Sequence, residues 1–297
     1  MRTTGARSHT GRVREGNEDR FLVREQRGTL LLAVADGVGG SSGGEVAADA
    51  ALNELGTRFF AASADRAPSD ALAEAIREAN AAVLRTAESS GQRDAASTLV
   101  ALAIRGGEAT VANLGDSRAY LVRDGECRQL TQDHSGAMAH AITRFVGDPR
   151  GVQPDVFVET LRDGDRLLLC SDGLTRHVTS EEIARTVARD DPQVAADALV
   201  DLANARGGQD NVTVVLHAPA TRRALVPLPG GGAVALALFV LLLLVTVGGT
   251  FAVLIASRPA TTPIPSAAPT AEPSPTPTAT PSATETPTGS PTPTATP

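Results

Sequence analysis

The chain has 297 residues, enough for one large domain or two small ones, and its 34 acidic residues outnumber its 27 basic ones, all of which are arginines. The resulting net charge of -7 at pH 7 argues against a nucleic-acid-binding protein, which needs a basic surface to neutralise phosphates. The absence of lysine excludes a Schiff base or a lysine-containing phosphate loop, and two cysteines, Cys127 and Cys170, are too few for a disulfide scaffold.

Up to about residue 220 the chain alternates short apolar runs with alanine-rich stretches. Residues 1–28 are polar and lack the apolar core of a secretory signal peptide, so we expect the N-terminal part to be cytoplasmic. Hydrophobic periodicity predicts strands at 29–35, 97–104, 109–114, 166–170 and 212–216, and helices at 43–60, 69–89, 180–189 and 192–206. Gly106 and Gly107 separate two of these strands in a tight link. Such consecutive hairpins favour an antiparallel sheet over βαβ units.

The residues after 220 have a different composition. We expect a linker at 221–232 and a single transmembrane helix at 233–257, because this stretch is uncharged and long enough to cross a hydrocarbon core of about 30 Å. Arg222 and Arg223 precede the stretch, which places the N-terminal domain in the cytoplasm by the positive-inside rule. Residues 258–297, rich in Pro, Thr, Ser and Ala, are predicted to be a disordered tail outside the cell, either a spacer or an inert extension.

Short acidic motifs lie next to several predicted strands. If the strand ends meet at one edge of the fold, they gather four carboxylates: Asp19, Asp36, Asp172 and Asp210. Carboxylates this close repel one another, which favours hard cations with oxygen ligands. Two such ions about 3.5–4 Å apart can activate a bridging water for attack on phosphorus. Any one Asp-Gly pair at a strand end is more often an ordinary turn, so only the joint occurrence of the motifs indicates a site.

Six short motifs follow one another along the chain: REGNED at 14–19, DGVGG at 36–40, NLGDSR at 113–118, LTQDHS at 130–135, CSDGL at 170–174 and DNVTV at 210–214. Together they resemble those of the metal-dependent type 2C (PPM) Ser/Thr protein phosphatases, and among them the bacterial membrane-anchored type. The first resembles the RxxNED opening of that family and the second its DGxGG motif, and the other four follow in the family's order. The similarity covers residues 5–218. It implies an α+β fold, an αββα sandwich of two antiparallel sheets flanked by helices, for a domain at 1–220.

The resemblance also implies ligands for two Mn²⁺ or Mg²⁺ ions. Asp36 would bridge the two ions, with the backbone carbonyl of Gly37 on one of them. Asp172 and Asp210 would hold the other ion, and Glu18 or Asp19 would contribute through bound water. A looser third ion would lie between Asp116 and Asp172.

Arg14 would bind the substrate phosphate, because its planar guanidinium matches two phosphate oxygens. The implied activity is hydrolysis of phosphoserine and phosphothreonine in proteins, by a water that bridges the two ions. Phosphorylated proteins, including Ser/Thr kinases at the membrane, would then be the partners. For three other polar residues we expect structural roles: Arg118 pairing with an acid, Asn211 ordering the loop around Asp210, and Glu45 starting a helix.

Two features depart from the family pattern. Some relatives carry a histidine where this chain has Val38, so no general acid can be assigned there. His134 is a tempting substitute, although a structural role near a turn suits it better. The segment between His134 and Arg144 is shorter than the flap of the family, which leaves peptide specificity and binding of a third ion open.

Two alternatives remain at this point. Cys170 and Arg176 have the spacing of a cysteine-based tyrosine phosphatase loop, but Asp172 would put a negative charge inside the anion site, and a buried thiol is a poor nucleophile. The second alternative is a membrane receptor or scaffold that binds phosphoproteins without turnover. The complete set of predicted ligands argues against it.

Overall fold

The computed structural model describes residues 3–38, 43–62, 66–136, 142–188 and 191–219. All of them belong to one compact unit, Met1–Ala224. The predicted linker, transmembrane helix and tail at 221–297 lie outside the described residues. Within the described ranges, no helix combines the length and the apolar character needed to span a bilayer.

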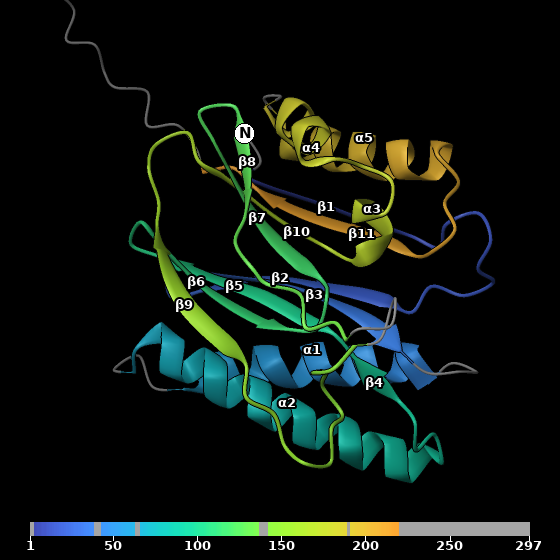
Figure 1. Ribbon diagram of the computed structural model, residues 1–297. Coiled ribbons are helices and arrows are strands. Elements are labelled where there is room, and N and C mark those ends of the chain that lie inside the picture. The colour runs from blue at the N-terminus through green and yellow to red at the C-terminus, as the bar shows by residue number, and fades with distance from the viewer. Residues whose placement is uncertain (1–2, 39–42, 63–65, 137–141, 189–190, 220–297) are drawn as a thin grey trace, which may run out of the picture. The chain divides into compact units, whose positions relative to one another are not determined.

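The described elements form four layers, helices on one side, two sheets in the middle and helices on the other side (Figure 1). The first sheet has the order β2-β3-β5-β6-β9: β2 (Asp19–Gln26), β3 (Thr29–Val38), β5 (Leu99–Arg105), β6 (Glu108–Leu114) and β9 (Asp155–Thr160), with the short β4 (Ala96–Ser97) paired to β3. The second sheet has the order β1-β11-β10-β7-β8: β1 (Thr4–His9), β11 (Val212–His217), β10 (Arg166–Cys170), β7 (Arg118–Arg123) and β8 (Glu126–Gln129). Their pairings are antiparallel, which confirms the predicted αββα sandwich.

The helices cover the outer face of each sheet. Long helices α1 (Gly43–Ala61) and α2 (Pro68–Ser90) lie on the first sheet, and the second sheet carries α3 (Asp172–Thr175), α4 (Ser180–Val187) and α5 (Pro192–Ala205). In β3, Leu31 and Ala33 pack under α1 and α2, whereas Leu32 and Val34 point into the layer between the sheets. Side chains of a strand alternate between its faces, and here both faces are buried, so the strand reads as one apolar run.

Some predicted boundaries were wrong in ways that affect the site. β3 continues to Val38, so Asp36 and Gly37 lie inside a strand and not after its end. Asp19 is the first residue of β2, which had not been predicted as a strand.

Candidate active site

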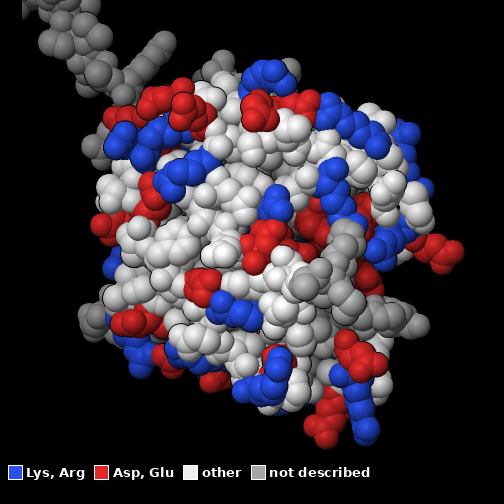
Figure 2. All heavy atoms as spheres, viewed as in Figure 1, with Lys and Arg blue, Asp and Glu red and all other residues white. Residues whose placement is uncertain are grey.

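The acidic residues predicted from the sequence come together at one end of the two sheets. Asp19 lies opposite Asp36 in the register of β2 and β3. In the second sheet Cys170 of β10 pairs with Arg118 of β7, so Asp172 and Asp116 lie just beyond two neighbouring strand ends. A hollow of about 810 Å³ is lined by residues from both sheets: Arg14, Glu18, Asp36, Gly37, Val38, Asp116, Ile142, Asp172, Arg176, Asp210 and Asn211. Figure 2 shows a hollow on this face in which acidic side chains gather beside basic ones.

Asp36 is at the centre of the acidic group. Burial raises its pKa well above the ordinary value, and the charges of Asp19, Asp172, Asp116 and Asp210 raise it further. Burial also raises the pKa of Asp116, with Asp172 adding to the effect, and that of Glu18, where Arg14 acts in the opposite direction. The directions of these shifts express the cost of holding several carboxylates together with little water.

The backbone around Asp36 is fixed by hydroxyl side chains of the neighbouring strands. Asp36 N–H donates to Thr98 Oγ1 at 3.0 Å, and its carbonyl oxygen accepts from Ser97 Oγ at 3.0 Å. Thr98 Oγ1 in turn lies 2.7 Å from Ser117 Oγ. Sequence reasoning did not assign these residues to the site, although Ser117 lies within the NLGDSR segment and was available as a signal.

Asp19 lies beneath the hollow and does not line it. It is 1% exposed, and burial raises its pKa to about 7. Asp19 Oδ2 accepts from Ser171 Oγ at 2.7 Å. Its other carboxyl oxygen, Oδ1, is buried without a hydrogen-bond partner. Ser171, like Ser97, Thr98 and Ser117, was not assigned to the site by the sequence analysis.

The donor set suits hard divalent cations. It consists of carboxylate oxygens from two sheets and the backbone of Gly37, and both Asp19 Oδ1 and Asp116 Oδ1 are buried polar atoms without a partner. Among the described residues, no three acidic, histidine or cysteine side chains are arranged so that together they could hold a metal ion as they stand. Arg14 and Arg176 pair with two of these carboxylates, Asp210 and Asp172.

Arg14 lies at the rim of the hollow. Its Nη2 is 3.0 Å from Asp210 Oδ1, and its side chain is 52% exposed. The loop that carries it is held by Asn211, whose Oδ1 accepts from Glu18 N–H at 2.9 Å and whose Nδ2 donates to the carbonyl oxygen of Gly16 at 2.9 Å. Asn211 thus orders the loop of Arg14, an extension of the role expected for it.

Arg176 is a second arginine of the hollow. Its Nε donates to Asp172 Oδ2 at 3.0 Å, and its Nη1 lies 3.7 Å from Asp210 Oδ2. The cysteine-based alternative does not fit this geometry, since Arg176 faces carboxylates. In addition, Cys170 is fully buried and burial raises the pKa of its thiol far above the ordinary value.

The other residues expected to be structural lie outside the hollow. His134 Nδ1 accepts from Gly115 N–H at 3.1 Å and His134 Nε2 lies 2.9 Å from Asp155 Oδ2, so both ring nitrogens are engaged. Arg118 forms a two-pronged ion pair with Asp133. Both findings confirm the structural roles expected from the sequence. Residues 137–141 of the shortened flap lie outside the described residues.

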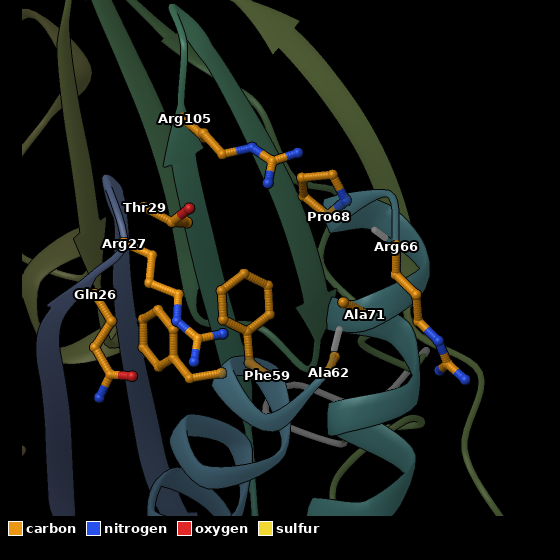
Figure 3. Close-up of a pocket in the computed structure, with 10 residues that line it drawn as sticks. Gln26, Arg27, Thr29, Phe59, Ala62, Arg66, Pro68, Ala71 and Arg105 are labelled. Atoms are coloured by element: carbon orange, nitrogen blue, oxygen red, sulfur yellow. The ribbon is translucent and has the colours of Figure 1, made fainter. Parts of the chain in front are cut away.

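A separate hollow of about 500 Å³ lies far from these carboxylates, where the end of α1 meets the start of α2 and the first sheet (Figure 3). It contains the edge-to-face pair Phe59 and Phe60, with ring centroids 5.1 Å apart, and the arginines Arg27, Arg66 and Arg105. The described residues that line it include no acid, so it offers no ligands for a divalent ion.

Comparison with known proteins identifies the family. The profile of the protein phosphatase 2C family matches residues 7–204. The chain is 34% identical over 234 residues to the serine/threonine phosphatase stp of Listeria monocytogenes, a match that covers 71% of this chain and 93% of that protein. It is 36% identical over 236 residues to the serine/threonine protein phosphatase PstP of Mycobacterium tuberculosis, covering 71% of this chain and 44% of that protein.

The fold is also similar to solved structures of the same kind. The catalytic domain of the serine/threonine protein phosphatase PstP in complex with two manganese ions matches with a TM-score of 0.64 and 34% identity, over 72% of this chain and 96% of that one. The chain belongs to the protein phosphatase 2C family.

Proposed function

We propose that this protein hydrolyses phosphoserine and phosphothreonine in proteins with the help of two Mn²⁺ or Mg²⁺ ions. The observation that carries the proposal is the meeting of Asp36, Asp172 and Asp210 in one hollow, with Arg14 at its rim. These residues are far apart in the sequence: Asp36 lies in β3, Asp172 begins α3, and Arg14 and Asp210 lie in the loops before β2 and β11. Family membership and the relatives' names support the same activity.

Each acid has a part in holding the ions. Asp36 would bridge them, with the carbonyl oxygen of Gly37 beside it, and Asp172 and Asp210 would complete the second position. Glu18 faces the hollow and Asp19 lies beneath it, so each would act through water. When bound, such ions supply an activated water and neutralise the charge that develops on the phosphoryl group.

Arg14 would bind and orient the phosphate of the substrate. Its guanidinium is half exposed and lies beside Asp210, so it can turn to an incoming phosphate without leaving the hollow. Two N–H groups in one plane match two phosphate oxygens, which fixes the orientation of the phosphoryl group as well as its position.

The surroundings of the hollow suit a polypeptide substrate. A groove of about 920 Å³ continues from it through two shared residues, Val38 and Ile142, and runs along Phe145 and Pro149. Val38 is 43% exposed although it is apolar. Residues that flank a phosphoserine could bury their apolar side chains here, whereas a small phosphate ester would leave the groove unused.

We also propose that the domain is attached to the cell membrane by the apolar stretch at 233–257, with the phosphatase domain in the cytoplasm and residues 258–297 outside. The uncharged composition of that stretch and the arginines before it support this topology. A phosphatase so placed would act in signalling, opposing Ser/Thr protein kinases at the membrane.

The activity is tested with the full-length protein in detergent. We expect hydrolysis of p-nitrophenyl phosphate and of phosphothreonine peptides in Mn²⁺, and none after the ions are removed with a chelator. Recovery of activity when Mn²⁺ is added back would distinguish ion removal from denaturation. A folded protein that binds phosphopeptides without turnover at any Mn²⁺ concentration would instead support the scaffold alternative.

A further inference from the structure

Arg176 lies among the carboxylates that were assigned to metal ions, although the sequence patterns gave it no part in that site. It follows α3, four residues after Asp172, and at this spacing a side chain turns back onto the earlier residue. Two of its nitrogens, Nε and Nη2, donate to Asp172 Oδ2, the first at 3.0 Å. Its third nitrogen, Nη1, lies 3.7 Å from Asp210 Oδ2.

The charge of Arg176 also reaches Asp116. Both residues line the same hollow, and the guanidinium partly offsets the effect of burial on the Asp116 carboxyl. Asp116 and Asp172 are the two residues that would hold a third, looser ion according to the family resemblance. Arg176 therefore lies at that pair of acids.

A guanidinium and a divalent ion compete for the same position next to Asp116 and Asp172. Arginine stays charged at every accessible pH and cannot dissociate from the protein. Asp172 Oδ2 already accepts two N–H groups from Arg176, so a third ion would have to share the other oxygen, Oδ1, with the second ion. A divalent ion close to the guanidinium would also be repelled by its charge.

We propose that Arg176 takes the place of a third metal ion, so that this protein works with two divalent ions. The proposal rests on the two-ion function above and makes it more specific, because it assigns the remaining charge compensation to a side chain. Catalysis should then depend on a single class of tightly bound ions, without a further requirement for a high concentration of Mn²⁺.

The test counts the Mn²⁺ ions bound by the full-length protein in detergent, using the electron paramagnetic resonance signal of free Mn²⁺ during a titration. This readout does not depend on turnover. We expect the wild type to saturate at two ions per chain and Arg176→Asp to bind one more. Arg176→Lys retains a positive charge and should stay at two.

Matched variants localise the effect. Arg14→Ala removes the other arginine of the hollow, which contacts Asp210 but neither acid of the third position, and should leave the count at two. Adding Asp116→Asn to Arg176→Asp should remove the additional ion. If Arg176→Asp does not fold, Arg176→Gln serves in its place, with circular dichroism as the check on folding.

Two results would overturn the inference: a wild type that binds three ions, or folded Arg176→Asp and Arg176→Gln variants that both stay at two. These are distinct from a failure of the proposed function, in which the wild type would bind no Mn²⁺ and show no Mn²⁺-dependent hydrolysis.

Discussion

Asp36 and Asp19 face each other across β2 and β3, an arrangement that a stable sheet normally avoids. Like charges directly opposite on antiparallel strands are destabilising. Here burial raises the pKa of both carboxyls, and the charge of Asp19 raises that of Asp36 further, so the charged form of each is disfavoured until a cation binds. The strand pairing thus holds together groups that repel, and the site is stabilised when a cation binds.

Replacement of Asp36 by Asn tests whether the repulsion among these carboxylates is relieved by a bound cation. We expect the variant to lose activity by about a hundredfold or more, because the central ligand is missing. In chelator it should unfold at a temperature no lower than that of the wild type, since a neutral side chain now lies among the acids. The increase in melting temperature that Mn²⁺ gives to the wild type should be absent.

A matched Asp→Asn change at an exposed position separates this effect from a general loss of charge. Asp163 is exposed and lies between β9 and β10, away from the hollow. Asp163→Asn should retain both activity and stabilisation by Mn²⁺. An Asp36→Asn variant that is still stabilised by Mn²⁺ as strongly as the wild type would contradict the assignment.

Arg14 is the second residue whose role can be measured. Arg14→Ala should raise KM for phosphopeptides by roughly ten- to a hundredfold, as expected for the loss of a charge-assisted hydrogen bond, with a smaller change in kcat. Steady-state kinetics at saturating Mn²⁺ gives both constants. Arg12 is an exposed arginine in the same loop, so Arg12→Ala makes the same change in charge and should leave KM unaltered. Unchanged kinetics in Arg14→Ala would remove the proposed phosphate contact.

At the scale of elements, the sequence predicted several of the strands that are buried on both faces, although it missed β7. β10 was predicted with its observed ends, and β3, β6 and β11 were found with small errors, because each forms a continuous apolar run. β2 and β9 carry exposed polar residues and have no such run. Hydrophobic periodicity therefore could not predict that Asp19 begins a strand and lies opposite Asp36.

The residues of the site can likewise be divided into those that the sequence predicted and those that it did not. The acids adjoin apolar runs and were found by motif. The meeting of the two sheets at one edge depends on long-range register, which residue spacing does not encode. The strand-end argument therefore had to assume that meeting in order to group Asp210 with the other acids, and only the family resemblance added Asp116. The supporting hydroxyls of Ser97 and Thr98 were not found, because Ser and Thr are common in strands and turns.

A contact between α2 and the segment that borders the groove provides a prediction of stability. Asn80 is 5% exposed, and its Oδ1 accepts from the N–H groups of Gly147 and Asp148 at 2.7 and 2.9 Å. Asn80→Ala leaves both buried donors without a partner, which should lower the free energy of unfolding by roughly 3 kcal/mol.

For a domain of this size, that loss corresponds to a decrease in melting temperature of roughly 6–12 °C. Thermal unfolding followed by circular dichroism measures it. Asn53→Ala makes the same replacement at an exposed position of α1 and should shift the melting temperature little. Equal shifts in the two variants would show that the Asn80 contacts do not stabilise the segment.

The groove itself can be tested through Phe145, which lines it and is partly exposed. Phe145→Ala should raise KM about tenfold for phosphopeptides with apolar residues beside the phosphothreonine, because a phenyl contact is lost. Hydrolysis of p-nitrophenyl phosphate should be unaffected. Val158→Ala, an exposed apolar truncation on β9, is the control. If Phe145→Ala raises KM equally for the peptide and for p-nitrophenyl phosphate, Phe145 affects the catalytic hollow and not peptide binding in the groove.

At the scale of the whole molecule, the described residues that line the catalytic hollow all belong to the compact unit that ends at Ala224. We therefore assign catalysis to the N-terminal domain and propose attachment to the membrane for residues 233–257. A truncation should separate the two properties. The local concentration of membrane-bound substrates would depend on the attachment alone.

A chain that ends at residue 223 should hydrolyse p-nitrophenyl phosphate with the kcat and KM of the full-length protein, because it retains all the described residues that line the hollow. After cell lysis it should remain in the supernatant at high-speed centrifugation, whereas the full-length protein should sediment with membranes and need detergent for release. Protease added to cells from which the cell wall and any outer membrane have been removed should cut only the tail from the full-length protein. The phosphatase domain should be protected, since we expect it to lie in the cytoplasm. Digestion of the phosphatase domain under these conditions would reverse the proposed orientation, and a full-length protein that stays in the supernatant would exclude the membrane anchor while leaving the phosphatase assignment intact.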